Sequence, residues 1–118
     1  MQTTRDVLRN HLNSFGRGDL DGILADYSPT AILFTPGGEL AGVDAIRPLF
    51  VGLLAEFAKP GASFELKHES VNGDFAYILW SAETADNIYE LATDTFVVRG
   101  GKIVAQSFAA KVAGKTRG

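Results

Sequence analysis

The stretch Thr93-Asp94-Thr95-Phe96-Val97-Val98-Arg99-Gly100-Gly101-Lys102-Ile103-Val104 decides the fold of this chain. Two runs rich in β-branched residues flank a glycine pair, and glycine takes positive φ at both central positions of a tight turn without strain. The resulting hairpin should pair Arg99 with Lys102, Val98 with Ile103, Phe96 with Ala105 and Asp94 with Ser107. Because side chains alternate along a strand, Asp94 shares a face with the apolar Phe96 and Val98. The pattern therefore predicts a buried carboxyl group.

Upstream of this hairpin, from residue 63, the apolar pattern has a period of two and is interrupted by turn sequences. Four meandering strands are predicted, at residues 63–71, 75–85, 88–99 and 102–110. The second strand is apolar on both faces between Phe75 and Ala82, which in an antiparallel sheet indicates that both faces are covered. Helices can cover one face. We expect a second copy of the chain to cover the other, giving a homodimer through the outer face of the sheet.

The first part of the chain has helical periodicity instead. Apolar residues at helical spacing predict a first helix over residues 3–15, with His11 in the middle of its buried stripe. A second helix follows, with an apolar stripe from Leu20 to Tyr27, and Pro29 should end it. Two short helices joined at Gly16 and Gly18 should form a hairpin.

A short strand at residues 31–35 and a third helix from about residue 42 to residue 57 complete the predicted elements. This order favours one α+β domain over residues 1–118, with three helices on the concave face of a curved antiparallel sheet. A long third helix laid across a curved sheet leaves a cone. We expect its wide end to hold a cavity for a small, largely apolar ligand.

The composition excludes several classes of function. The net charge of -3 and the interspersed acids and bases argue against nucleic-acid and membrane partners. No apolar run is long enough for a signal sequence or a membrane span, so a cytoplasmic protein is expected. There are no cysteines, and the two histidines, His11 and His68, lack the close spacing of metal ligands, so neither a metal nor another cofactor is predicted. The glycine pair lacks the context of a nucleotide-binding motif.

Three segments resemble the nuclear transport factor 2-like superfamily, in its ketosteroid isomerase and SnoaL-like branch. Gly18–Leu24 is similar to the opening of that branch's second helix, Ala41–Arg47 to the opening of its third helix, and Asp94–Ile103 to its final hairpin. The resemblance implies a cone-shaped, cystatin-like fold, a cavity between helices and sheet, and a homodimer. It also implies ligands similar to polyketides or steroids.

In the steroid isomerases the resemblance implies three working positions: a tyrosine on the first helix, an aspartate base before a proline, and an aspartic acid on the penultimate strand. Here these positions hold His11, Thr35 and Asp94. A threonine cannot take a proton from carbon at neutral pH. Two functions therefore stay open: a proton-transfer isomerase or lyase in which His11 and Asp94 are catalytic, and a non-catalytic ligand-binding or dimerisation module.

Two mechanisms are compatible with the enzyme hypothesis. Asp94 can accept a hydrogen bond from His11 and orient it as an acid-base group, or apolar surroundings can keep Asp94 protonated as a hydrogen-bond donor. A structural pair without substrate is the alternative. The residues expected to line the ligand cavity are Phe15, Tyr27, Phe34, Phe50, Phe57, Tyr77, Leu79, Phe96 and Ser107.

The orientation of Trp80 depends on one loop. A two-residue turn at Asp86-Asn87 places Leu79 opposite Asp94 and turns Trp80 to the outer face of the sheet. A loop one residue longer reverses the two side chains.

Overall fold

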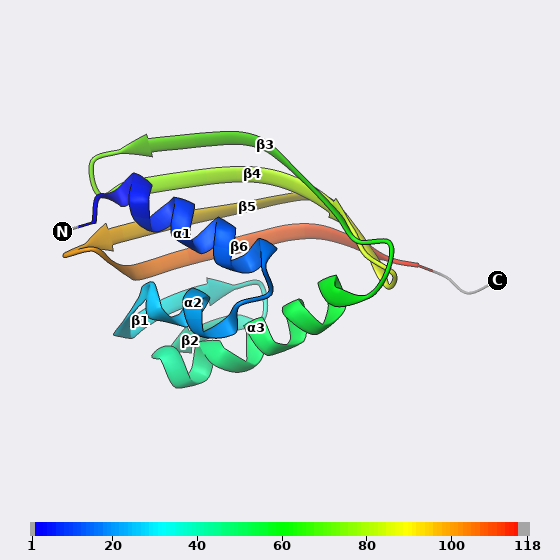
Figure 1. The fold of residues 1–118 in the computed structure, drawn as a ribbon, viewed down its shortest axis with the longest axis horizontal. Helices are drawn as coiled ribbons and strands as arrows, with labels where there is room; N and C mark the ends of the chain where they lie inside the picture. The colour runs from blue at the N-terminus through cyan, green and yellow to red at the C-terminus, as the bar shows by residue number, and fades with distance from the viewer. Residues whose placement is uncertain (1, 116–118) are drawn as a thin grey trace.

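The computed structural model describes residues 2–115, which form three helices and six strands (Figure 1). The helices are α1 (Thr4–Gly16), α2 (Leu20–Ala25) and α3 (Val43–Ala58). The strands are β1 (Tyr27–Thr35), β2 (Gly38–Ala41), β3 (Ser63–Asn72), β4 (Phe75–Glu83), β5 (Asn87–Arg99) and β6 (Lys102–Gly114).

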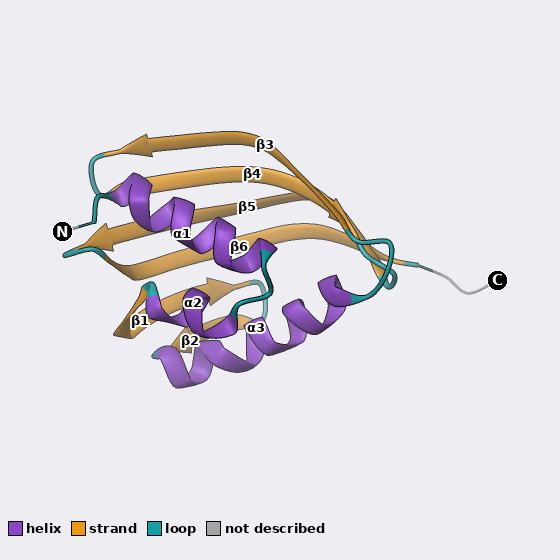
Figure 2. Cartoon of the chain, viewed as in Figure 1, coloured by secondary structure: helices purple, strands orange, loops and turns teal. Residues whose placement is uncertain are grey.

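The strands form one sheet in the order β2-β1-β6-β5-β4-β3. All neighbours are antiparallel except β1 and β6, which run parallel, so the sheet is mixed. The three helices lie across one face of the curved sheet, as the purple ribbons in Figure 2 show. The predicted α+β architecture is confirmed, and so is the meander of the last four strands.

Helix α1 begins where the sequence predicts. The Thr3 hydroxyl accepts a hydrogen bond from the Asp6 amide, and the Asp6 carboxylate accepts one from the Thr3 amide, both at 3.1 Å. This reciprocal capping box satisfies two amides that would otherwise lack partners at the helix start. The apolar stripe buries Val7 and Leu8 completely, and His11 lies on the same face.

The second helix and the first strand differ from the sequence prediction. Helix α2 ends at Ala25, and Tyr27 begins strand β1 rather than completing the helical stripe. Pro29 lies inside β1, where the pairing with β6 is irregular between Tyr27 and Ile32. A strand tolerates proline at such an irregularity because the missing N–H is not needed there. The short edge strand β2 was not predicted from the sequence.

The β5–β6 hairpin confirms half of the predicted pairing. Gly100 and Gly101 both have positive φ, and the first two pairs are Arg99 with Lys102 and Val98 with Ile103. Beyond them Val104 is an extra residue in β6, because Val98 pairs with Ile103 whereas Val97 pairs with Ala105. This β-bulge shifts the register by one, so that Phe96 pairs with Gln106 and Asp94 with Phe108. The predicted pairs Phe96 with Ala105 and Asp94 with Ser107 are wrong.

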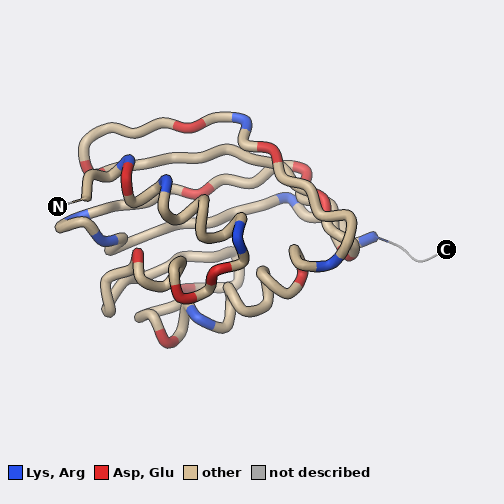
Figure 3. Tube along the Cα trace, viewed as in Figure 1, with Lys and Arg blue, Asp and Glu red and all other residues tan. Residues whose placement is uncertain are grey.

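The helices do not close over the whole sheet. Helix α1 packs on β4 and β5, whereas α3 packs on β1, β2 and α2, which leaves the interior of the cone between them. Figure 3 shows acidic and basic positions interspersed along the trace. Within residues 2–115, no helix has both the length and the apolar character needed to cross a bilayer.

Candidate functional site

A cavity of about 500 Å³ occupies the interior of the cone. Its volume lies in the range of small-molecule sites. The walls come from α1 and the residues after it, from α3, and from the concave face of the sheet, and they are mainly apolar and aromatic. Polar side chains are few among them: His11, Arg17, Ser63, Asp94 and Gln106. An apolar cavity with a few convergent polar groups is typical of a ligand site.

Asp94 is the buried carboxyl group that the alternation of β5 predicts, with an exposed fraction of 7%. The Trp80 indole N–H donates to its Oδ2 at 2.8 Å, and the Gln106 amide donates to its Oδ1 at 2.9 Å. Burial raises the pKa of Asp94 above its ordinary value, against the opposing effects of both hydrogen bonds and of the nearby His11. The cavity therefore holds a carboxyl group that resists ionisation.

Tyr27 fixes the amide that holds Asp94. Its hydroxyl donates to Gln106 Oε1 at 2.5 Å, so the amide nitrogen of Gln106 points to Asp94. Burial, followed by the negative charges of Asp94 and Asp26, raises the pKa of Tyr27 well above its ordinary value. A tyrosine that stays neutral is a permanent donor. Tyr27 therefore donates to Gln106, Gln106 donates to Asp94, and Asp94 is the final acceptor.

His11 is buried beside this chain, among three aromatic rings. The rings of Tyr27, Phe50 and Phe96 meet the imidazole edge-on, with centroid distances of 5.5, 5.7 and 5.5 Å. Its Nδ1 lies 3.5 Å from Oδ2 of Asp26, and both atoms are buried without a hydrogen-bond partner among the described residues. The imidazole thus has a carboxylate on one edge and lines the cavity as well.

Asp26 is the site residue that the sequence analysis missed. It is the C-cap of α2 and has an exposed fraction of 7%. A signal was present, because Asp26 follows the fully buried Ile23 by three positions, a spacing that places two side chains on one helix face.

His11 and Asp94 do not form the pair that one of the two mechanisms requires. Among the contacts of residues 2–115, no hydrogen bond or ion pair joins them, and each has partners of its own. They face one cavity from two polar sets: Asp94 with Trp80 and Gln106, and His11 with Asp26.

The predicted lining residues separate into three groups. Those that line the cavity are Phe15, Phe50, Phe57 and Phe96. Tyr27 is buried behind the lining. Those that the structure places elsewhere are Phe34 and Ser107, which are exposed, and Tyr77 and Leu79, which lie half-buried on the opposite face of β4 from Trp80.

Register explains the displaced residues. Ile78, not Leu79, pairs with Asp94. Two features set this register: the connection between the paired residues Glu83 and Ile88 is longer than two residues, and the β4–β5 pairing shifts between Trp80 and Ala82. Trp80 therefore faces the cavity, stacked with Phe108 at a centroid distance of 6.2 Å. The bulge at Val104 places Gln106, rather than Ser107, on the same wall.

Thr35 is engaged in a turn instead of the cavity. Its hydroxyl donates to the Gly38 carbonyl at 2.8 Å and accepts from the Gly37 amide at 3.2 Å. The side chain is thus part of the β1–β2 connection. In the part of the chain that the structure describes, no three His, Cys, Asp or Glu side chains are grouped so that they could hold a metal ion.

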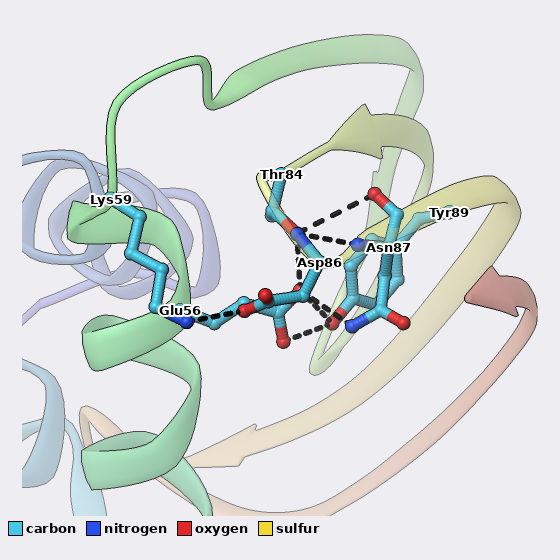
Figure 4. Close-up of polar contacts among 6 residues, drawn as sticks. All are labelled: Glu56, Lys59, Thr84, Asp86, Asn87 and Tyr89. Carbon is cyan, nitrogen blue, oxygen red and sulfur yellow. Dashed lines mark hydrogen bonds and ion pairs between the residues drawn. The ribbon is translucent and has the colours of Figure 1, made fainter. Parts of the chain in front are cut away.

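A second polar cluster lies outside the cavity, where the end of α3 meets the β4–β5 turn (Figure 4). The Glu56 carboxylate accepts hydrogen bonds from Thr84 Oγ1 at 2.6 Å, Asn87 Nδ2 at 2.9 Å and Tyr89 OH at 3.0 and 3.1 Å. Burial pulls the pKa of Glu56 upward, but the hydrogen bonds from these three residues outweigh it, so the pKa lies below its ordinary value.

This cluster joins the end of α3 to the β4–β5 turn. Lys59 donates to Asp86 at 2.8 Å in the same turn. Burial and the hydrogen bond to Glu56 raise the pKa of Tyr89 to about 12, and the Tyr89 ring packs on Trp80 at a centroid distance of 5.6 Å. The end of α3 is thereby tied to the aromatic residue that contacts Asp94.

Residues 8–106 match the family model described as a SnoaL-like domain. The chain belongs to the SnoaL-like family. No curated protein matches this SnoaL-like domain.

Solved structures similar to this SnoaL-like domain include SalBIII, an epoxide hydrolase/cyclase-like enzyme with a role in pyran ring formation in the polyether salinomycin. The two share 17% identity over 95% of each chain, with a TM-score of 0.79. A candidate ketosteroid isomerase from Kribbella flavida is 12% identical over 98% of this chain and 82% of its own, with a TM-score of 0.75. A nuclear transport factor 2-like protein of unknown function from Mesorhizobium loti is 24% identical over 92% and 90%, with a TM-score of 0.78. These likenesses establish the nuclear transport factor 2-like fold.

Proposed function

We propose that this SnoaL-like domain binds a small, largely apolar molecule in its cavity and catalyses proton transfer on it, as an isomerase or a lyase. One observation carries the proposal. A buried carboxyl group with a raised pKa and a buried histidine converge on an otherwise apolar cavity. Ionisable groups with shifted pKa values in a cavity mark functional sites. Neighbours named as a ketosteroid isomerase and a cyclase-like enzyme support a polyketide- or steroid-like substrate.

In the proposed mechanism His11 moves the proton. When Nδ1 carries a hydrogen directed toward Asp26, Nε2 on the opposite edge of the ring is the free acceptor. Nε2 takes a proton from the carbon next to a carbonyl, and the electron pair of the C–H bond passes to the carbonyl oxygen. Asp94, protonated, donates a hydrogen bond to that oxygen, while Trp80 and Gln106 hold its carboxyl group in place. His11 then returns the proton to another carbon, or to a departing β-hydroxyl group that leaves as water.

The first test is binding of a planar phenol, followed by the fluorescence of Trp80, the sole tryptophan, which lines the cavity. Wild-type protein should bind saturably. Asp94→Leu should weaken binding by roughly tenfold or more, because a lost hydrogen bond in a desolvated site is worth more than about 1 kcal/mol. Asp21→Asn, at an exposed carboxylate, is the matched control and should bind like wild type.

Chemistry is tested separately by deuterium exchange at the α-carbon of an unsaturated ketone, followed by nuclear magnetic resonance. Exchange should occur with wild-type protein and disappear in His11→Ala and Asp94→Asn. Asp26→Asn should slow it without weakening binding, because Asp26 orients His11 and lies behind it. Exchange that is equal in wild type and His11→Ala would contradict the mechanism.

Thr35 favours a second candidate function, a non-catalytic ligand-binding module of the same fold. The base position implied by the steroid isomerases is occupied by a hydroxyl that belongs to a turn. This candidate predicts saturable phenol binding without exchange on any ketone. The two readouts therefore distinguish the candidates.

We also propose that the outer face of the sheet joins two copies of the chain. Across the inner strands β1, β6, β5 and β4, three rows of paired residues on that face carry no charged side chain: Ile32, Ala105, Val97 and Phe75; Phe34, Ser107, Thr95 and Tyr77; and Ala109, Thr93 and Leu79. The edge strands add Glu39 beside Phe34 and His68 beside Leu79. Phe34 and Phe75 are 50% and 54% exposed in the single chain. Sedimentation should show a dimer at micromolar concentration, and Leu79→Glu should give a folded monomer. A monomeric wild type would contradict the proposal.

A further inference from the structure

The cavity has a polar inner end and an opening of different character. His11 and Asp94 are buried at the inner end. Two segments that line the cavity are themselves exposed to solvent, residues 16–18 at the end of α1 and residues 62–64 at the start of β3, and they mark the opening. Arg17 lies in the first of these segments, and its side chain is 64% exposed. It contributes a permanent positive charge to the entrance.

Arg17 is the single Lys or Arg among the described residues that line the cavity. The chain has a net charge of -3, so this cation is not part of a generally basic surface. Helix α1 ends directly before Arg17, which is its C-cap, and the backbone amide of Arg17 bonds back into the helix. The base of the side chain is therefore fixed at the opening by the helix end.

The guanidinium of Arg17 keeps donors for a ligand. Its recorded contacts are made through Nη2, which donates to Ser14 Oγ at 3.5 Å and lies 3.7 Å from Asp19 Oδ2. A guanidinium has five N–H donors. Exposed ion pairs of this kind contribute little energy, and Asp19 also accepts a hydrogen bond from the Gly22 amide at 2.9 Å. A ligand anion can therefore bind the guanidinium without breaking a strong contact.

The cavity walls between the opening and the inner end indicate which shape of ligand fits. Phe64 stands at the opening with an exposed fraction of 47%, and its ring packs on Trp80 at a centroid distance of 5.4 Å. On the other side Phe15 and Phe57 meet edge-on at 5.2 Å. Flat aromatic surfaces that run from the opening to Asp94 suit a planar, apolar body.

We propose that the ligand is an organic carboxylate whose planar apolar body carries an oxygen function at the far end. The oxygen reaches Asp94 and His11, and the carboxylate stays at the opening on Arg17. This substrate class rests on the proposed function of the cavity and adds a residue that determines specificity. Arginine matches a carboxylate because its planar fork can donate two parallel hydrogen bonds.

The experiment compares two probes of nearly the same shape, of which one carries a negative charge and the other is neutral. A series of 4-hydroxyphenyl alkanoates of increasing chain length is titrated beside the corresponding primary amides, with Trp80 fluorescence as the readout. At the chain length that spans the cavity, wild-type protein should bind the carboxylate about fivefold more tightly than the amide, as expected for an exposed charge pair. The preference should shrink in about 1 M salt, because salt screens exposed charges.

Variants assign the preference to one residue. Arg17→Gln should remove it while the affinity for the amide stays unchanged, and Arg17→Lys should retain part of it. Arg9→Gln is the matched control, because Arg9 is an exposed arginine of α1 that pairs with Glu69 at 2.9 Å. The Arg9→Gln variant should prefer the carboxylate over the amide to the same extent as wild-type protein.

Three results would overturn the inference. Equal binding of both probes at every chain length contradicts the anionic ligand but leaves the cavity proposal standing. A preference that survives in Arg17→Gln contradicts the role of Arg17. Binding of neither probe to wild-type protein contradicts the proposed function itself, and the inference with it.

Discussion

The carboxyl groups of Asp94 and Glu56 both accept hydrogen bonds from side chains of the sheet or of its β4–β5 turn, but their surroundings differ. Asp94 is buried and has two donors, and burial raises its pKa. Glu56 is half-buried and has donors from three residues, whose hydrogen bonds outweigh burial and lower its pKa. The direction of the pKa shift thus depends on whether hydrogen-bond donors outweigh the effect of burial. Where they do, as at Glu56, the ionised carboxylate is stabilised; where they do not, as at Asp94, the neutral acid is favoured.

Removal of Glu56 should have the largest effect on stability. Glu56→Ala leaves Thr84, Asn87 and Tyr89 without their shared acceptor, and we expect a loss of about 3 kcal/mol in the free energy of unfolding. Glu56→Gln should lose about half as much, because its amide oxygen still accepts. Urea denaturation measures both. Glu90→Ala, at an exposed pair with Lys111, should change the free energy by less than about 0.5 kcal/mol.

If Glu56→Ala is as stable as Glu90→Ala, Glu56 does not hold the fold together, and its contrast with Asp94 is wrong. Phenol binding should survive in Glu56→Gln. The Glu56 cluster lies outside the cavity and contacts the cavity residue Trp80 through the packing of Tyr89.

The two carboxyl groups should give pH dependences of opposite sign. The folded-state pKa of Glu56 is below its ordinary value of 4.5, so its contribution to stability is present above that pH and is lost as the pH falls through the folded-state pKa. The folded-state pKa of Asp94 is above its ordinary value of 3.8, so its ionisation destabilises the fold as the pH rises through the folded-state pKa.

Denaturation of wild type, Glu56→Gln and Asp94→Asn between pH 3 and pH 8 measures this difference. The deficit of Glu56→Gln relative to wild type should shrink in acid. The stability of Asp94→Asn relative to wild type should improve toward neutral pH. Parallel curves for the two variants would show that the environments of the carboxyl groups do not differ as the structure implies.

Trp80→Phe should have a smaller effect and should sharpen the comparison. It keeps a ring at the stacked position but removes the N–H that donates to Asp94, so the pKa of Asp94 should rise further. We expect a cost of about 1 kcal/mol in unfolding free energy at neutral pH. In an Asp94→Asn background the pH-dependent part of this cost should vanish, as a double-mutant cycle measures. A pH-dependent cost that persists there would place its origin outside Asp94.

The sequence predicted those features that depend on local spacing. The period of β5 was enough to predict a buried Asp94 beside Phe96, and the capped apolar stripe of α1 was enough to place His11 in the interior. The alternation of a strand and the repeat of a helix are properties of the backbone itself, so they survive without knowledge of the neighbours.

Features that depend on contacts between distant segments were missed. Gln106 and Trp80 face the cavity because of register shifts in β6 and in the β4–β5 pair, and such shifts arise where a sheet curves over its core. Asp26 meets His11 only because α1 and α2 fold back on each other. A single register shift reverses the face of every later residue, so the predicted Ser107 and Leu79 failed together for the same kind of reason.

The extra residue Val104 makes the chemistry of the cavity wall independent of a change of one residue in the length of β6. With Val104 present, an amide and an aromatic ring, Gln106 and Phe108, face inward. Its deletion would leave Ala105 opposite Val97, Gln106 opposite Phe96 and Phe108 opposite Asp94, because the ladder already passes over Val104. The bulge therefore lets β6 lose one residue without exchanging the side chains that face the cavity, whereas the same loss from a strand without a bulge would reverse them.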